Sequence, residues 1–424
     1  MLNKIVQIWK INDLRKSILF VLAMLVIFRI AAHIPVPNVD VGALKNLFQN
    51  NQLLGLINVF SGGSMENFSV VMLGIAPYIT ASIIFQLLTM VIPKLEELSK
   101  EGEYGRQKIN QWTRWLTVPL AFLQSFGMIT ILRQSAADVL PNFTSWQMLV
   151  AMVTITGGTI FLMWIGELIS EKHIGNGISL LIFAGIISGL PTSVGSTFYT
   201  YDQTQIVNMI VFTAIALITI ISVVIITEGQ RNIPVSYARR IRGNKVYGGT
   251  NTHLPLRVNQ AGVIPIIFAI AIIMFPPLIA QLFLRVKTSW LAASAQWVVQ
   301  IFQDQLFYGI AYFVMVVAFT YFYTAVIFHP DQIAENLQKQ GGFVPGIRPG
   351  KTTAEYLQKI VTRIIFTGAL FLGIIAVLPL ITAQITSTQS LVVGGTSLLI
   401  VVSVVIEMVS QINAQLSMRD YEEI

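Results

Sequence analysis

The sequence predicts an all-α polytopic membrane protein with ten membrane-spanning helices. Three observations lead to this class. Of the 424 residues, 54% are hydrophobic and only 11% are charged, which is far from the balance of a soluble domain. Apolar runs of about 20 residues, the length that crosses ~30 Å of hydrocarbon, recur along the whole chain. Lys and Arg gather in alternate connections between these runs, as the positive-inside rule requires.

The ten predicted spans follow one another with no soluble domain or linker of any size between them. They cover residues 17–34, 71–92, 114–132, 149–170, 177–190, 206–227, 260–284, 305–328, 363–380 and 391–412. The fifth is short, so we expect it to be tilted or broken. No cleavable signal peptide is expected, because the first run is long and no small-residue cleavage pattern follows it. Cys is absent, which excludes a disulfide framework and thiolate chemistry.

The basic residues predict the orientation. If both ends of the chain face the cytoplasm, the outer connections hold only Arg29, Lys45, Arg133, Arg285 and Lys287, and the other basic residues lie inside. This asymmetry supports an even number of spans, with both termini cytoplasmic and most of the net charge of +7 on one face. Topology alone explains the charges of the short connections. The 229–258 and 329–359 loops are longer than topology requires and could also bind an acidic partner, such as nucleic acid in a ribonucleoprotein.

Two pairs of matching features suggest an internal repeat. Gly177-Ile-Ser-Leu-Leu-Ile182 opens the fifth span, and Gly395-Thr-Ser-Leu-Leu-Ile400 opens the tenth. Pro77 lies early in the second span and Pro265 early in the seventh. Both pairs are five spans apart, and an odd number of spans inverts the second copy. We therefore predict two inverted halves, residues 1–200 and 201–424, with the functional site at their interface.

A segment before the second span predicts a passage through the membrane. Residues 53–68 are half apolar and interrupted by glycines, and an uncharged stretch that can cross a bilayer follows them. Irregular backbone beside a spanning helix is tolerated where it lines a cavity or is buried in protein. The sequence thus predicts an interior plug or re-entrant segment.

Catalytic and ion-binding patterns are weak. No Asp, Glu, Lys, Arg or His lies near the middle of a predicted span, which argues against a proton-coupled carrier, though not against a sodium site made of carbonyls. Gly346-Ile-Arg-Pro-Gly350-Lys-Thr is one residue too short for a phosphate loop, and Pro349 removes an amide donor. The four histidines are scattered and show no metal-ligand spacing. We expect no enzyme, cofactor or metal.

At this point several motifs match a known family in the right order, over essentially the whole chain. They are Phe60-Ser-Gly-Gly63, Gly74 to Leu88, Leu162-Met-Trp-Ile-Gly-Glu167, Ile174-Gly-Asn-Gly-Ile-Ser179, Leu254-Pro-Leu-Arg-Val-Asn-Gln-Ala-Gly-Val-Ile-Pro265, Pro345-Gly-Ile-Arg-Pro-Gly350 and Gly394-Gly-Thr-Ser-Leu-Leu-Ile400. The chain resembles the SecY/Sec61 alpha family, which forms the channel of the protein translocon. It departs from the family at His173, where Gly is usual, and this puts the backbone geometry of that turn in doubt.

The resemblance implies a protein-conducting channel with an hourglass pore between two inverted halves. It implies a constriction ring of Ile75, Ile79, Ile182, Ile186, Ile267 and Ile400, although periodicity alone favours packed or lipid-facing isoleucine. It implies a plug near residues 57–68, including Phe60, Ser61, Gly62, Gly63 and Ser64. It also implies a lateral gate where spans two and three part from seven and eight, with Thr80, Gln86, Gln124, Asn259 and Phe275 as gate candidates.

The same resemblance implies partners and a location. Arg239, Arg240, Arg242, Lys245 and Arg348 would engage the SecA motor ATPase or the ribosome. SecE would clamp the halves, SecG is expected as a third subunit, and signal sequences of preproteins would enter the gate. The location implied is the bacterial cytoplasmic membrane, with the lipid bilayer taking up released segments.

A secondary transporter of small solutes is the alternative, since inverted repeats and proline-broken helices suit it too. It would need a polar site at the midplane, where the candidate lining here is isoleucine. A membrane-embedded enzyme would need clustered catalytic residues in the membrane, and the sequence shows none.

Overall fold

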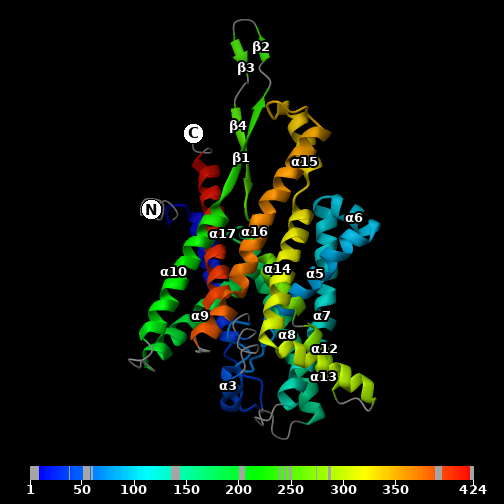
Figure 1. Ribbon diagram of the computed structural model, residues 1–424, viewed down its shortest axis with the longest axis vertical. Helices are drawn as coiled ribbons and strands as arrows, with labels where there is room; N and C mark the ends of the chain where they lie inside the picture. Colours follow the sequence, from blue (N-terminus) through cyan, green and yellow to red (C-terminus); the bar gives the residue numbers. More distant parts are fainter. Residues whose placement is uncertain are drawn as a thin grey trace.

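The computed structural model describes residues 9–37, 39–50, 58, 61–134, 144–199, 206–237, 240–242, 245–247, 251–273, 275–284, 288–386 and 394–420. Long helices form a bundle along the vertical axis of Figure 1. Helices occupy all ten predicted spans: α2 (Asn12–Ala31), α5 (Ala76–Val91), α7 (Glu103–Gln134), α8 (Ser145–Ser170), α9 (Gly177–Tyr199), α10 (Ile206–Glu228), the consecutive α11 (Ile264–Ile273) and α12 (Phe275–Phe283), α14 (Gln305–Ile327), α16 (Lys351–Thr386) and α17 (Gly394–Asp420).

Length and hydropathy support the membrane assignment. Within the described part of the chain, six stretches are long and apolar enough to cross a bilayer, and a seventh is added if α5 and the bent α6 (Pro93–Lys100) count as one. The chain is therefore a helical, multi-pass membrane protein, and the predicted fold class is confirmed. The count of ten spans remains a prediction that this architecture accommodates.

Prolines explain where the helices differ from the predicted spans. The second span was expected from residue 71, but residues 71–75 are turns and α5 begins at Ala76, with Pro77 in its first turn. At the other end, Pro93 forces Ile92 into an extended conformation, and α6 leaves at 103° to α5. The seventh span is divided into α11 and α12, and Pro276 and Pro277 lie in the first turn of α12, where a missing N–H is tolerated.

The long connections carry five short strands that the sequence analysis did not predict. β1 (Gln230–Tyr237) pairs antiparallel with β4 (Asn251–Arg257), and β5 (Gly342–Phe343) pairs with the end of β1. A second hairpin, β2 (Arg240–Arg242) and β3 (Lys245–Tyr247), extends beyond this sheet. The two loops predicted as separate partner-binding segments, 229–258 and 329–359, are thus joined by one three-stranded sheet.

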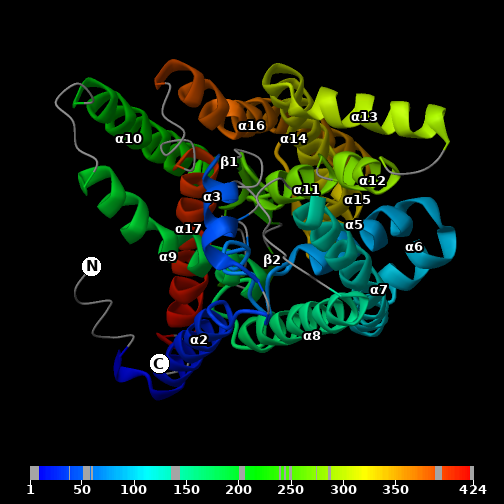
Figure 2. The same ribbon diagram turned by 90° about the horizontal axis from the view of Figure 1, so that it is seen from below.

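Shorter helices lie at the two ends of the bundle. α15 (Pro330–Lys339) lies at the end that carries the strands, and α3 (Val41–Asn50) and α13 (Ser289–Gln303) lie at the opposite end (Figure 1). Seen along the bundle, α3 lies over the middle of the helices, while α13 runs along the periphery (Figure 2).

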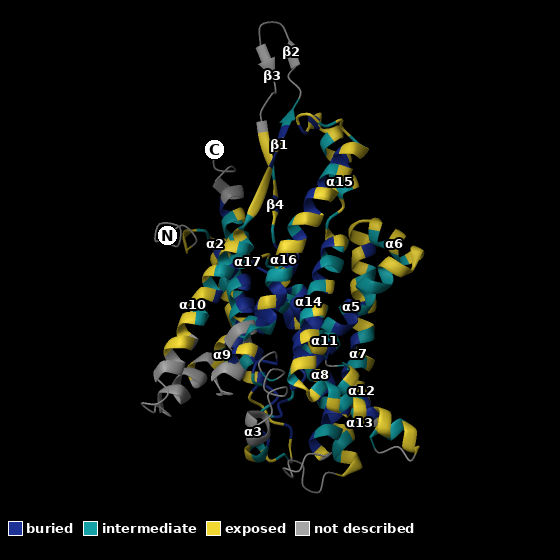
Figure 3. Cartoon of the chain, viewed as in Figure 1, coloured by how far each residue is buried: buried dark blue, intermediate teal, exposed yellow. Residues whose placement is uncertain are grey.

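Three apolar clusters form the core. The largest joins α5, α8, α9, α11, α14, α16 and α17 in the middle of the bundle, a second joins residues 61–73 to α3, α7 and α8, and a third lies between the sheet and α16. Exposed residues concentrate on the outer faces of the helices (Figure 3). Many of these are large and apolar, such as Ile218 on α10 at 64% exposure. An apolar exterior is what lipid contact requires.

Candidate pore, plug and gate

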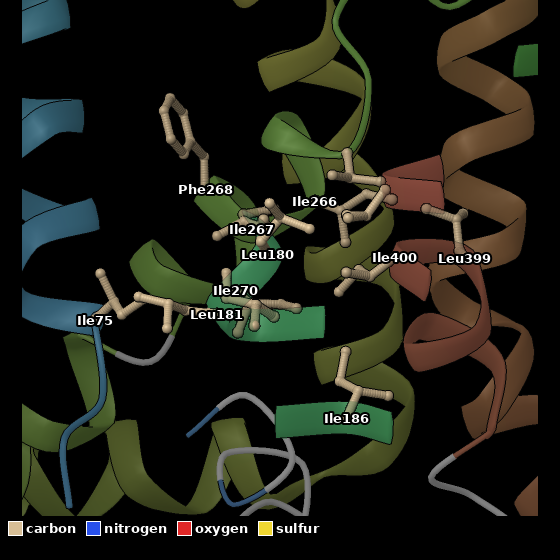
Figure 4. Packing of buried hydrophobic residues seen from close by; sticks show 14 of the residues in the cluster. Ile75, Leu180, Leu181, Ile186, Ile266, Ile267, Phe268, Ile270, Leu399 and Ile400 are labelled. Atoms are coloured by element: carbon tan, nitrogen blue, oxygen red, sulfur yellow. The ribbon is translucent and has the colours of Figure 1, made fainter. Parts of the chain in front are cut away.

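The six predicted ring isoleucines lie in one continuous apolar cluster. Five of them, Ile75, Ile182, Ile186, Ile267 and Ile400, are at most 7% exposed, and Ile79 is partly buried against the same cluster. They come from four helices that are distant in sequence: the start of α5, then α9, α11 and α17. Figure 4 shows Ile75, Ile186, Ile267 and Ile400 in this region.

The apolar layer is thicker than the predicted ring. Leu181, Ile266, Ile270 and Leu399 belong to the same cluster and lie among the ring residues in Figure 4. Aliphatic side chains offer neither hydrogen bonds nor charge. This layer therefore offers water and ions no polar partner.

The segment predicted as a plug is a compact, internally bonded turn structure. Ser64, fully buried, donates its hydroxyl to the carbonyl oxygens of Ser61 at 2.7 Å and Val71 at 3.1 Å. Asn58 Nδ2 donates to Glu66 Oε2 at 2.9 Å, and Glu66 N donates to Asn58 Oδ1 at 3.1 Å. Phe60 lies outside the described residues. These bonds hold the segment together without regular secondary structure.

Glycines allow this segment to lie directly against α9. Gly62 and Gly63 have φ of +72° and +76°, a region that favours glycine. A Cβ on Gly62 would come within 2.8 Å of the Cα of Gly185. The two backbones are in contact, so neither position has room for a side chain.

Arg29 on α2 binds the same turn, a contact that the sequence analysis missed. Its guanidinium donates to the carbonyl oxygen of Gly62 at 2.6 Å. From the sequence, Arg29 is expected only as an outer topology charge. A usable signal was present, because Arg29 falls inside the predicted 17–34 span, and a charge there needs a partner.

The candidate gate helices form a closed seam. α5 packs against α7 and α11, and α12 packs against α7. Thr80 is buried and donates to the carbonyl of Ala76 at 3.0 Å, while Gln124 on α7 and Phe275 at the start of α12 are half-buried.

Gln86 and Asn259 are the remaining two gate candidates. In the part of the chain that the structure describes, Gln86 Oε1 and Asn259 Oδ1 are buried without a hydrogen-bond partner. An unpaired buried acceptor costs about 1–3 kcal/mol.

The candidate partner-binding residues project from the end that carries the strands. Arg240 pairs with Tyr247 and Arg242 with Lys245 across the β2–β3 hairpin, which places three basic residues on it. Arg239 lies outside the described residues. Arg348 is exposed, in the turn between β5 and α16, and its carbonyl accepts a bond from Thr353 Oγ1 at 2.8 Å. The three-stranded sheet therefore connects the Arg348 turn and the β2–β3 hairpin.

The departure at His173 acquires a structural explanation. His173 has φ of +55°, so the turn keeps the backbone geometry that suits Gly, and Gln415 of α17 donates to its carbonyl at 2.8 Å. Nearby in the sequence, Glu167 forms an ion pair with Arg114 of α7, Nε to Oε1 at 2.7 Å. Among the described residues no group of three His, Asp or Glu side chains could hold a metal ion.

Comparisons with known proteins agree with this architecture. A family model for SecY matches residues 69–409. The chain is 45% identical to the protein translocase subunit SecY of Corynebacterium glutamicum, with 99% of each chain covered. It is 42% identical to the same subunit of Streptomyces scabiei, over 100% of this chain and 99% of that one.

Solved structures share the fold. A protein-conducting channel superposes with a TM-score of 0.63 at 19% identity, over 93% of this chain and 91% of that one. Sec61 of the canine ribosome–channel complex superposes with a TM-score of 0.59 at 18% identity, with the same coverage. The fold and its exposed apolar surface define a helical, multi-pass membrane protein. The chain belongs to the SecY family.

Proposed function

We propose that this chain forms the pore through which unfolded preproteins cross a membrane and from which hydrophobic segments leave sideways into lipid. One observation carries the proposal. Six isoleucines from four sequence-distant helices gather in one buried cluster, beside a glycine-rich turn packed on α9. Family membership makes polypeptide the cargo, since the relatives are translocase subunits.

In the resting channel two elements prevent a leak. The isoleucine ring is an apolar constriction that expels water, and the plug near residues 57–68 closes the path beside it. A passing polypeptide displaces the plug, and the ring then fits around the extended chain without holding it. The halves 1–200 and 201–424 are the two bodies that separate.

The proposed lateral gate lies where α5 and α7, the second and third spans, part from α11, α12 and α14, the seventh and eighth. A signal sequence is apolar, so it gains free energy by moving from the aqueous path into lipid through this seam. Gln86 and Asn259, whose side-chain oxygens are buried without a partner among the described residues, are the proposed polar groups of this gate. Thr80, Gln124 and Phe275 complete the proposed gate.

We propose that the chain has no catalytic activity of its own. The energy for transport then comes from its partners. The β2–β3 hairpin and the Arg348 turn lie at one end of the bundle, suited to the SecA motor or the ribosome. SecE would clamp the halves, and SecG would complete the complex. We place this end and both termini in the cytoplasm, and the protein in the bacterial cytoplasmic membrane, on the basis of its basic residues.

Ion conductance tests the proposed seal. Replacing Ile182 and Ile400 together with Ser should wet the constriction and raise the resting conductance in planar bilayers. The control is Ile218→Ser on the outer face of α10, which should leave conductance unchanged. If the folded double variant conducts no more than the control, the isoleucine cluster is not the seal.

A further inference from the structure

Helix α13 has an unusual composition for a segment at the end of a bundle. Its 15 residues, Ser289–Gln303, contain no charged side chain but include two tryptophans and three glutamines. It is not a predicted span, and it follows the proposed gate helix α12.

The helix presents three different faces. Ala292, Ala295, Val299 and Phe302 are buried or half-buried, and they mark the side that packs against α12 and α14. Trp290 and Trp297, seven residues apart, share a second face and are 68% and 64% exposed. The third face carries Gln296, Gln300 and Gln303, all exposed, at helical spacings of four and three.

The two exposed faces point in different directions. At about 100° per residue, the glutamine face lies roughly a quarter-turn from the tryptophan face. One side of the exposed surface is therefore aromatic and the other is polar and uncharged. This arrangement suits a helix that lies at a boundary between apolar and aqueous surroundings.

The positions of the other tryptophans locate such a boundary. All seven tryptophans of the chain are at least 40% exposed. Four of them, Trp9, Trp112, Trp115 and Trp164, lie near the ends of α2, α7 and α8 that point toward the strands. Trp146 starts α8 at the opposite end, where α13 also lies (Figure 1). Exposed tryptophans at the two ends of a helical bundle mark the two membrane–water interfaces.

A single residue, Asp304, connects α13 to α14. Asp304 ends α13 and caps α14, where its carboxylate accepts a bond from Leu306 N at 3.1 Å. Phe302 and Phe307 meet edge to face across this corner, with ring centroids 5.4 Å apart. The depth of α13 in the membrane therefore fixes the depth of the corner and of the α14 end joined to it.

We propose that α13 is an interfacial helix that binds the lipid surface, with Trp290 and Trp297 among the glycerol and upper acyl groups and its glutamines in water. The occupant of the tryptophan face is lipid, because this face continues the exposed apolar exterior of a membrane-spanning bundle. Recognition depends on the interface itself rather than on headgroup charge, because α13 carries no charge. Binding is thus independent of the anionic lipid content.

Single cysteines test the proposal, since the native chain has none. Spin labels at Trp297→Cys and Gln300→Cys are compared in phosphatidylcholine vesicles and in vesicles that also contain phosphatidylglycerol. We expect the label at 297 to be relaxed by oxygen, which partitions into lipid, and the label at 300 by a water-soluble nickel chelate. Both lipid mixtures should give the same pattern.

A second measurement avoids any dependence on labelled variants. Lipids brominated near the headgroup should quench the fluorescence of the parent protein, and Trp290→Phe with Trp297→Phe should reduce that quenching by roughly two-sevenths if all tryptophans contribute equally. Nickel access at both labelled positions would overturn the proposal, because α13 would then stand in water. Access of neither reagent at 297 would also overturn it, because protein would then cover the tryptophan face.

Discussion

The backbones of Gly62 and Gly185 touch across the interface between the proposed plug and α9. A Cβ built on Gly185 would lie 2.5 Å from the Cα of Gly62, closer than such atoms approach in proteins. Gly62 also receives the hydrogen bond from Arg29 of α2. The turn at Gly62 is thus held by both α2 and α9. Only glycine fits at this position, because a side chain would clash with α9.

This contact predicts that one methyl group on α9 loosens the plug. Gly185→Ala should push the 61–64 turn away and raise the resting conductance several-fold. Gly189→Ala is the matched control on the same helix, one turn further on, where a Cβ would meet nothing within 4 Å. Equal conductance of the two folded variants would show that the turn is not part of the seal.

The turn at His173 predicts a stabilising substitution. His173 holds φ of +55°, where residues with a Cβ pay about 1 kcal/mol or more. His173→Gly should raise the free energy of unfolding by about 1 kcal/mol, because the bond from Gln415 uses only the backbone of residue 173. Thermal unfolding in detergent measures the change. His173→Ala removes the ring but keeps the Cβ, so a gain of equal size in that variant would refute the backbone explanation.

The exposed Arg348 predicts a dependence on side-chain geometry rather than on charge alone. Pro345 and Pro349 restrict the backbone on either side, and a guanidinium binds a carboxylate of a partner through two parallel bonds. Arg348→Lys should insert normally and slow SecA-driven export, and Arg348→Glu should reduce it roughly tenfold or more.

The assay is translocation of a preprotein into vesicles with matched channel levels. Lys351→Glu is the control, since Lys351 is exposed nearby at the start of α16. If Arg348 served only as a topology charge, Arg348→Glu and Lys351→Glu would change the export rate equally. Export by Arg348→Glu at the parent rate would remove Arg348 from the partner-binding surface.

Local sequence patterns predicted the helices well and the long-range contacts poorly. Hydropathy located all ten helical regions, because membrane spans need long apolar runs. It did not locate the strands, since the pairing of Ser236 with Phe343 joins two loops more than 100 residues apart. The division of α5 from α6 follows from Pro93, a local signal that the run-length argument ignored.

The candidate site shows the same limit. The isoleucine ring came from family resemblance, since periodicity alone favoured packing or lipid contact for each isoleucine. The glycine motif at 62–63 suggested an irregular segment, but nothing local indicates that Gly185 is its partner. Arg29 carried a detectable signal, a charge inside an apolar run, and the structure supplies its partner.

Contact between the ring and a moving cargo tests the central proposal most directly. A photo-reactive side chain is placed at Ile400 or Ile182 in the ring and, as a control, at Ile218 on the outer face of α10. A preprotein arrested halfway through the channel is then irradiated in vesicles. The account predicts crosslinks to the arrested chain from positions 400 and 182 and none from position 218. Crosslinks from position 218 alone, or equal crosslinks from all three, would contradict a cargo path through the isoleucine ring.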